Sequence, residues 1–190
     1  MAIYLTSDLH LNHRDIQITL RPAFRSTEEH DEYVIRQYNK VVGEDDKVYI
    51  LGDLGFSPAA ALSILVKKLN GRKTLIVGNH DQLNDAKYHA MGIDEVIRHP
   101  VYLTDSIVLS HVPLRELAGS PFAVNVHGHV HGTCLDLPNF VNVNVDVCGY
   151  RPVSLDAVKK KASEVCRPCR WEPFGSEWYS GHEIKTESKK

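Results

Sequence analysis

The sequence predicts an α/β fold in which short buried strands end in polar loops. The chain has 190 residues, of which 43% are hydrophobic, and this suits one domain with a sizeable core better than two small ones. Five short apolar runs are followed at once by Asp, Asn or His, and open α/β folds place their chemistry at such strand ends. We expect one domain over residues 1–170 and a surface extension over residues 171–190.

The first half of the chain is expected to alternate strands with helices. Ser26 and Glu29 have the spacing of a capping box at the start of a helix. Ser57 is the expected cap of a second helix, with Pro58 in its first turn, and Asp81 is the expected cap of a third. The expected strands are residues 3–7, 48–51 and 74–77, the helices are residues 26–43, 57–70 and 82–90, and residues 14–25 are expected to form an irregular loop.

From residue 96 onward the pattern changes to short strands separated by turns. Asp105 and Ser106 suit a tight turn, which indicates an antiparallel second half. In residues 141–147 valines alternate with polar residues, so one face is expected to be buried and the other wet or hydrogen-bonded. Further strands are expected at residues 96–97, 101–103, 107–109 and 123–126, and a last helix at residues 154–165.

Charge and composition limit the partners of this chain. The formal net charge is −2, so tight sequence-independent binding to long nucleic acid is not favoured. Neither a signal core nor an apolar run of membrane-spanning length is visible, and we expect a soluble cytoplasmic protein. Cys166 and Cys169 form a C-x-x-C pair, but no second pair supplies two more zinc ligands, so structural roles or surface thiols are expected for the cysteines.

Acidic, amide and imidazole side chains recur at the expected strand ends. A lone histidine after a strand is usually structural, but here the same feature occurs repeatedly. Asp8 and His10 project to one side if the backbone is extended, and glycines around Asp53 let its carboxylate face a site. Without a counter-ion, burying these groups together would cost several kcal/mol each, and a dication removes that cost. The set consists of Asp8, His10, Asp53, Asn79, His80, His111, His129 and His131.

The size of this set predicts two ions. A metal site with an open position usually takes three or four protein ligands, so two aspartates, one asparagine and four histidines would overfill one site. Asp53 is the natural bridge, and ions about 3.5–4 Å apart form a clamp used in phosphoryl chemistry. Carboxylate and amide oxygens with imidazoles suit Mn²⁺, Fe²⁺, Zn²⁺ or Ni²⁺ better than Ca²⁺, and we expect Mn²⁺.

Five motifs follow one another along the chain. Glycines accompany the polar residues in three of them, where the backbone must turn sharply. The motifs are D-x-H at residues 8–10, GDxG at 52–55, GNHD at 78–81, a lone histidine at 111 and GHxH at 128–131.

This order resembles the calcineurin-like metallophosphoesterase superfamily. His13 and residues 144–154 are similar to the small phage and bacterial members, whereas residues 21–24 read Arg-Pro-Ala-Phe in place of their usual Arg-Pro-Phe. The resemblance implies a four-layer αββα sandwich, in which two mixed β-sheets pack face to face with helices outside.

The resemblance also implies a role for each polar residue. His80 is not needed as a ligand and is implied to contact the phosphate or to protonate the leaving oxygen. His127 is expected behind the ligands or in the core. The first ion would bind Asp8, His10, Asp53 and His131, the second would bind Asp53, Asn79, His111 and His129, the catalytic residues would be His80 and Asp53, and the substrate contacts would be Asn79, His80 and Arg21.

The expected function is hydrolysis of a small phosphoester, a diester or a monoester such as a nucleotide, by attack of a metal-bound hydroxide. One alternative is a nuclease, which would need an extended binding surface. Another is a non-catalytic scaffold, but scaffold members of the family typically lack several ligands, and every ligand is present here. The sequence leaves the physiological substrate, the native metal and the oligomeric state open.

Overall fold

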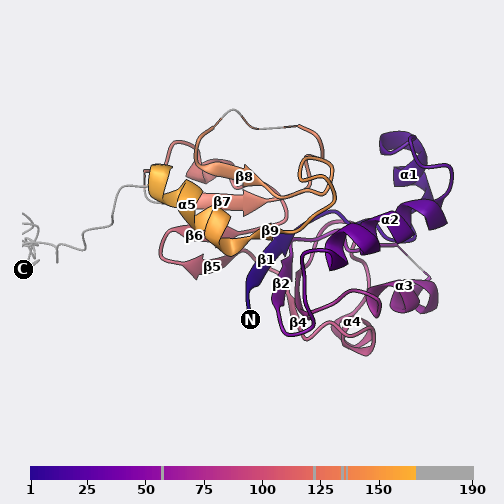
Figure 1. Ribbon diagram of the computed structural model, residues 1–190. Coiled ribbons are helices and arrows are strands. Elements are labelled where there is room, and N and C mark those ends of the chain that lie inside the picture. The colour runs from indigo at the N-terminus through magenta and orange to yellow at the C-terminus, as the bar shows by residue number, and fades with distance from the viewer. Residues whose placement is uncertain (57, 122, 134, 136, 166–190) are drawn as a thin grey trace, which may run out of the picture.

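Two mixed β-sheets packed face to face form the centre of the molecule, with helices flanking them (Figure 1). The computed structural model describes residues 1–165 except 57, 122, 134 and 136. The expected fold class is confirmed. The expected extension, the Cys166–Cys169 pair and Cys134 lie outside the described residues, as does the expected cap Ser57.

The larger sheet has the strand order β4-β3-β2-β1-β9. Its first four strands in the chain pair in parallel, as expected for strands joined by helical crossovers, and β9 pairs antiparallel with β1. Their carboxyl ends therefore meet at one edge. The strands are β1 (Ile3–Thr6), β2 (Lys47–Ile50), β3 (Arg72–Ile76), β4 (Glu95–Ile97) and β9 (Val153–Ser154).

Three helices cover the outer face of this sheet. Val34 and Tyr38 of α2 and Leu62 of α3 pack with strand residues such as Ile50 in a cluster whose members are almost fully buried. This apolar face, rather than helix propensity alone, holds short helices in place. The helices are α2 (Thr27–Asn39), α3 (Ala59–Val66) and α4 (Asp85–Ala90).

The helix starts differ in part from those expected. Ser26 caps α2 by accepting the Glu29 N–H at 3.2 Å, as predicted, but the Glu29 carboxylate accepts the N–H of Arg25 instead of that of Ser26. Pro58 is itself the N-cap residue of α3. Asn84 caps α4 in place of Asp81.

Residues 14–25 were expected to form a loop, yet Arg14–Leu20 form helix α1. His13 caps this helix by accepting the N–H of Ile16 on Nδ1. The prediction failed because neither the cap nor an apolar stripe of this short helix has a conventional signature.

The smaller sheet has the order β5-β6-β7-β8 and is only partly antiparallel. β5 and β6 form the expected hairpin, but β6, β7 and β8 pair in parallel, with the 3-10 helix η1 (Arg115–Leu117) in the crossover between β6 and β7. The expected antiparallel second half is thus wrong except for this hairpin, since β4 (Glu95–Ile97) also pairs in parallel, with β3 of the larger sheet. The strands are β5 (Val101–Thr104), β6 (Ile107–Leu109), β7 (Val124–His127) and β8 (Phe140–Asn142).

The strand expected at residues 141–147 ends at Asn142. The side-chain oxygen of Asn142 accepts the N–H of Asn144, and that of Asn144 accepts the N–H of Asp146, each at 2.9 Å. Such local side-chain bonds compete with strand pairing and turn the chain.

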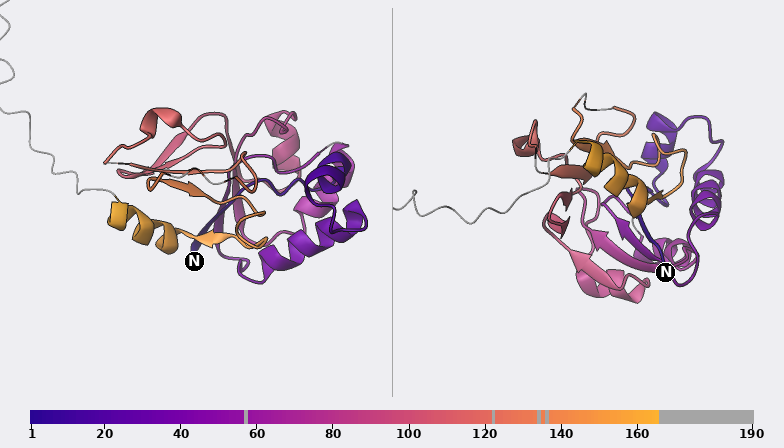
Figure 2. Two further views of the ribbon diagram at one scale, coloured as in Figure 1. Left: turned by 90° about the horizontal axis from the view of Figure 1, so that it is seen from above. Right: turned by 60° about the vertical axis from the view of Figure 1, so that its left-hand side comes forward.

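The space between the sheets is filled by aliphatic side chains from both. Leu5 and Leu51, on the side of the larger sheet, pack against Leu109 and Val126 on the side of the smaller sheet. Helix α5 (Leu155–Val165) adds further apolar side chains to this core, the first of which is Leu155. Figures 1 and 2 show α5 on the side of the smaller sheet, away from α2 and α3. Within the described part of the chain, no helix combines the length and the apolar character needed to cross a membrane.

Candidate metal centre

The carboxyl ends of the central strands of both sheets converge on one polar site. Asp8 follows β1, Asp53 follows β2 and Asn79 follows β3, while His111 follows β6. The loop after β7 adds His129 and His131. These side chains form two groups of converging ligand atoms.

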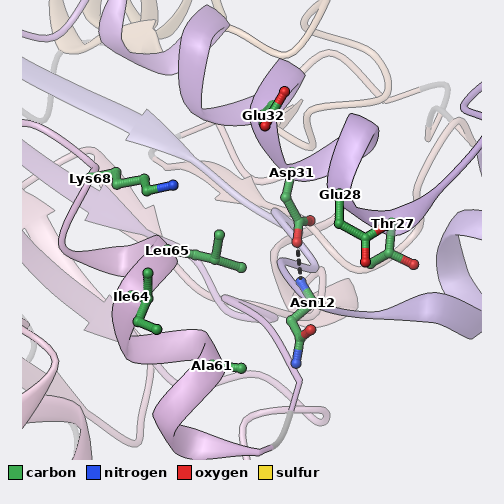
Figure 3. A pocket seen from close by; sticks show the side chains of 9 residues that line it. All are labelled: Asn12, Thr27, Glu28, Asp31, Glu32, Ala61, Ile64, Leu65 and Lys68. Carbon is green, nitrogen blue, oxygen red and sulfur yellow. Dashed lines mark hydrogen bonds between the residues drawn. The ribbon is translucent and has the colours of Figure 1, made fainter.

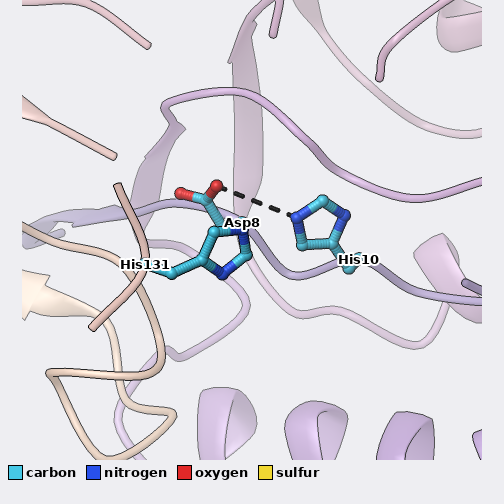
Figure 4. Close-up of side chains that lie close together, drawn as sticks. All are labelled: Asp8, His10 and His131. Atoms are coloured by element: carbon cyan, nitrogen blue, oxygen red, sulfur yellow. Dashed lines mark ion pairs between the residues drawn. The ribbon is translucent and has the colours of Figure 1, made fainter. Parts of the chain in front are cut away.

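The first group consists of Asp8, His10 and His131 (Figure 4). One potential ligand atom from each lies within 4.8 Å of the others. His10 Nε2 lies 3.8 Å from Asp8 Oδ1, and the His10 ring stacks on His131 with centroids 5.3 Å apart. Asp8 and His10 are 0% exposed, whereas His131 is partly exposed and lies on the solvent side of the group.

The second group consists of Asp53, His111 and His129, whose ligand atoms also lie within 4.8 Å of one another. The Oδ1 atom of Asn79 lies 2.9 Å from His111 Nε2 and 3.0 Å from His129 Nδ1. All four side chains expected around a second ion are therefore adjacent.

Asp53 lies between the two groups. Its Oδ2 atom is 3.6 Å from His10 Nε2 and 3.5 Å from His111 Nε2. Its Oδ1 atom accepts the N–H of His80 at 3.0 Å, which fixes the plane of the carboxylate. This is the position that a bridging ligand must occupy.

The backbone at the site is unusual, because five of these residues have positive φ. Side chains with a Cβ rarely adopt this left-handed region, and such residues cluster at functional sites. The extended geometry expected to bring Asp8 and His10 together is therefore wrong, and left-handed turns do so instead. The φ angles are 59° at Asp8, 48° at His10, 54° at Asp53, 67° at His129 and 48° at His131.

Neighbouring loops hold these turns. Asp8 N donates to Gly52 O, and His10 N donates to Asp53 O, both at 3.0 Å. The carboxylate of Asp81 accepts the N–H groups of Asp53 and Gly78, which explains why Asp81 does not cap a helix. The loops after the first three strands thus form one hydrogen-bonded unit.

The glycines of the motifs are required by close approach, as Gly78 and Gly128 illustrate. A Cβ on Gly78 would collide with the carboxylate of Asp53, and a Cβ on Gly128 would collide with Ser7 and Asp8. Gly52 also has φ +85°, which confirms the expected sharp bend before Asp53.

The chemistry of the first group fits a divalent cation. Neither ring nitrogen of His10 has a hydrogen-bond partner among the described residues, although the ring is buried. Burial lowers the pKa of His10, and the nearby charge of Arg21 lowers it further, so the imidazole is neutral, as a metal ligand must be. Burial also raises the pKa of Asp8, which a bound cation would offset. His10 Nε2 is an unpartnered buried nitrogen that faces the carboxylates of Asp8 and Asp53, and an ion bound between them would explain it.

Arg21 does not fit the substrate contact expected of it. Its side chain is 3% exposed, and its guanidinium donates to Asp146 Oδ1 at 2.8 Å, to the carbonyl of Asp8 at 2.7 Å and to the carbonyl of Leu9 at 3.1 Å. These acceptors turn the guanidinium toward the back of the metal-binding loop. We infer a positioning role in place of phosphate binding.

Asp146 is the site residue that the sequence did not reveal. Its Oδ2 atom lies 2.8 Å from His131 Nδ1, so the ring donates to Asp146 and leaves Nε2 for the first group. The available signal was a carboxylate within the alternating valines of residues 141–147.

The remaining histidines lie around the centre. The partly exposed His80 has its ring centroid 5.3 Å from that of His10, at the rim of the first group. His127 is 0% exposed and its Nδ1 contacts the carbonyl of Gly128 at 3.0 Å, a core position that agrees with the expectation.

A separate cavity of about 280 Å³ lies between α2 and α3 (Figure 3). Glu28, Asp31 and Glu32 give it an acidic rim, and α3 supplies an apolar wall. Asp31 is already bonded to the N–H of Asn12 at 2.9 Å. Its carboxylates make it unsuited to a phosphoester, so the metal centre is the site with the relevant chemistry.

Two mixed sheets with paired groups of metal-binding side chains at their strand ends are the arrangement of a metal-dependent phosphoesterase. The chain belongs to the calcineurin-like phosphoesterase family, whose sequence profile, described as "Calcineurin-like phosphoesterase", matches residues 1–183. The family implies phosphoester hydrolase activity.

One known relative and one solved structure match most of the chain, and a phage relative matches a shorter part of it. The uncharacterized protein MJ1445 of Methanocaldococcus jannaschii is 36% identical over 172 residues, which cover 83% of this chain and 89% of that protein. The gene 66 protein of Mycobacterium phage L5 is 40% identical over 81 residues, or 41% of this chain and 39% of the phage protein. The structure of the protein of unknown function AQ665 from Aquifex aeolicus superposes with a TM-score of 0.66 at 26% identity, covering 84% of this chain and 98% of that one.

Proposed function

We propose that this protein is a dinuclear metal-dependent phosphoesterase that hydrolyses a small phosphoester. The observation that carries the proposal is the position of the Asp53 Oδ2 atom, 3.6 Å from His10 in one ligand group and 3.5 Å from His111 in the other. A single carboxylate oxygen shared in this way suits two adjacent cations.

In this proposal some residues bind the ions and others contact the substrate. Two divalent ions, for which we propose Mn²⁺, would lower the pKa of water toward ~7 and so supply hydroxide near neutral pH, and would stabilise charge on the phosphoryl oxygens. Asp8 and Asp53 would hold the ions without cancelling all of their charge, so an anionic ester would be attracted. His80, tied through its N–H to Asp53, would donate a proton to the leaving oxygen.

The surroundings of the centre favour a small substrate. A cavity of about 190 Å³ lined by Phe56, His80 and Leu83 lies on one side. A second, of about 210 Å³, is lined by Asn79, Arg98 and His111 on the other. These volumes suit the organic groups of a small ester, and the net charge of −2 offers no extended basic surface for long nucleic acid.

The test is a screen of small phosphomonoesters and phosphodiesters, with single-stranded DNA and RNA in parallel. Each would be offered to the metal-free chain reloaded with Mn²⁺, Zn²⁺, Fe²⁺ or Ni²⁺. We expect turnover of a small ester with Mn²⁺ above the other ions and loss of turnover on chelation. Cleavage of nucleic acid without turnover of any small ester would make the protein a nuclease, and no turnover at all would make it a scaffold.

A further inference from the structure

One ring nitrogen of His13 accepts a hydrogen bond, and the other has no hydrogen-bond partner among the described residues. It is 6% exposed and lies in the loop between β1 and α1. Its Nδ1 atom accepts the N–H of Ile16 at 3.4 Å. Since this contact uses the Nδ1 lone pair, the ring is in the neutral form that carries its proton on Nε2.

The Nε2–H group has no acceptor within the described part of the chain. The ring is surrounded by other rings, with centroids 5.3 Å away at His10, 5.2 Å at His80 and 4.6 Å at Phe56. A buried donor without an acceptor is costly, and such a group in a folded protein calls for an explanation.

His13 does not fit the role of a further metal ligand. A nitrogen that carries a proton has no lone pair to give to a cation. Neither group of converging ligand atoms includes His13, although His10, three residues earlier, belongs to the first. The missing partner of Nε2–H is thus an acceptor and not a cation.

We propose that His13 Nε2–H donates a hydrogen bond to a phosphoryl oxygen of the bound ester, which makes His13 a further substrate-binding residue. This rests on the proposed function, because the phosphoryl group is the acceptor that the metal centre would bring beside His10 and His80. A neutral donor suits this place, since the charge of an arginine or lysine would be repelled by the cations.

Two substitutions separate the two nitrogens. His13→Asn keeps a side-chain oxygen that can cap α1, but its amide ends short of the Nε2 position. His13→Gln places an amide N–H near the Nε2 position and gives up the cap. The probe is inorganic phosphate, titrated by calorimetry into the full chain loaded with Mn²⁺, with metal content measured on each variant.

For His13→Asn we expect the Kd for phosphate to increase about tenfold, because one hydrogen bond to a charged acceptor is lost. The metal content should not change. For His13→Gln we expect a Kd within about threefold of wild type, and a lower melting temperature than His13→Asn. Wild-type affinity in His13→Asn would overturn the proposal, as would equal losses of affinity in both variants.

A measurement on the wild type keeps the proposal testable if a variant fails to fold. In the Zn²⁺-loaded protein, phosphate should shift the Nε2–H proton resonance of His13 downfield and slow its exchange, and an unchanged resonance would contradict the contact. The proposed function is judged separately by turnover of wild type. Weaker phosphate binding in His13→Asn with an inactive wild type would refute the function alone, whereas an active wild type with unchanged phosphate binding in His13→Asn would refute the contact alone.

Discussion

The two ligand groups differ in depth and in what supports them. In the first group Asp8 and His10 are 0% exposed and His131 is partly exposed, whereas in the second Asp53 and His111 are buried but both Asn79 and His129 are accessible. Asp8 accepts hydrogen bonds from Ser7 and from the N–H of His129, and His131 is held by Asp146. In the second group Asn79, His111 and His129 contact one another, His111 Nδ1 also contacts the carbonyl of Leu51 at 2.8 Å, and Asp53 Oδ1 accepts the N–H of His80.

This difference indicates two sites of unequal affinity. Ligands that are already oriented lose little freedom when an ion binds, and supporting hydrogen bonds raise metal affinity. Solvent reaches the second group more easily, which favours exchange. We therefore expect a tightly held first ion and a more labile second ion, joined through Asp53.

The largest effect is expected from the residue that both sites share. Asp53→Asn should lower turnover of a small phosphoester by at least about a hundredfold, since it removes a charged ligand from both ions. Metal analysis should find fewer than two ions per chain. Asp105→Asn, in the turn between β5 and β6, is the matched control and should keep both properties. Normal turnover in Asp53→Asn would exclude the bridge.

The next comparison removes one ligand from each group. His10→Ala should lose the tight ion and retain a labile one, while His129→Ala should lose the labile ion and retain the tight one. After timed dialysis against a chelator, His129→Ala should hold more metal than His10→Ala. Equal retention by the two variants would mean that burial of the first group does not set its affinity.

A smaller effect on metal affinity is expected from Asp146, which contacts the candidate ligand His131. Asp146→Asn weakens the support of His131, and the affinity of the first site should fall about 10- to 100-fold, the range for residues that orient metal ligands. In a calorimetric titration only the tight phase should move. A loss shared by both phases would show that Asp146 supports the fold in general and not His131 in particular.

The smallest expected effect concerns stability of the whole chain. Metal at about 100 times its Kd adds about 2.7 kcal/mol to the free energy of unfolding, which corresponds to roughly 5–10 °C in melting temperature at this size. Chelation should lower the melting temperature of wild type by this amount, and that of His10→Ala by less. No shift in wild type would argue that the ions contribute nothing to folding.

Much of the fold was predictable because its strongest patterns are local. The apolar runs that became β1, β2 and β3 and the Ser26 cap of α2 are read from neighbouring residues. Helix α1 was missed because an imidazole caps it, and the parallel pairing of β6, β7 and β8 was missed because pairing depends on distant partners.

The residues of the candidate site were likewise predictable where the pattern is local and missed where it depends on distant contacts. Its seven candidate ligands could be named because each lies in a short motif that follows an apolar run. Arg21 was assigned to substrate because a surface arginine and a buried one look alike in a sequence. Asp146 was not singled out, since its partner His131 lies 15 residues away in the chain.

The sequence by itself determined which residues are the candidates for the chemistry, since residue type and local spacing reveal carboxylates, imidazoles and glycines at strand ends. The tertiary structure alone decided how they meet, through left-handed turns at Asp8 and Asp53 held by hydrogen bonds between loops that are distant in the chain. It also decided which side chains are buried, and this burial places Arg21 and Asp146 beside the candidate ligands and leaves His13 Nε2 without an acceptor among the described residues. Such contacts depend on packing between separate elements, and no short segment of sequence encodes them.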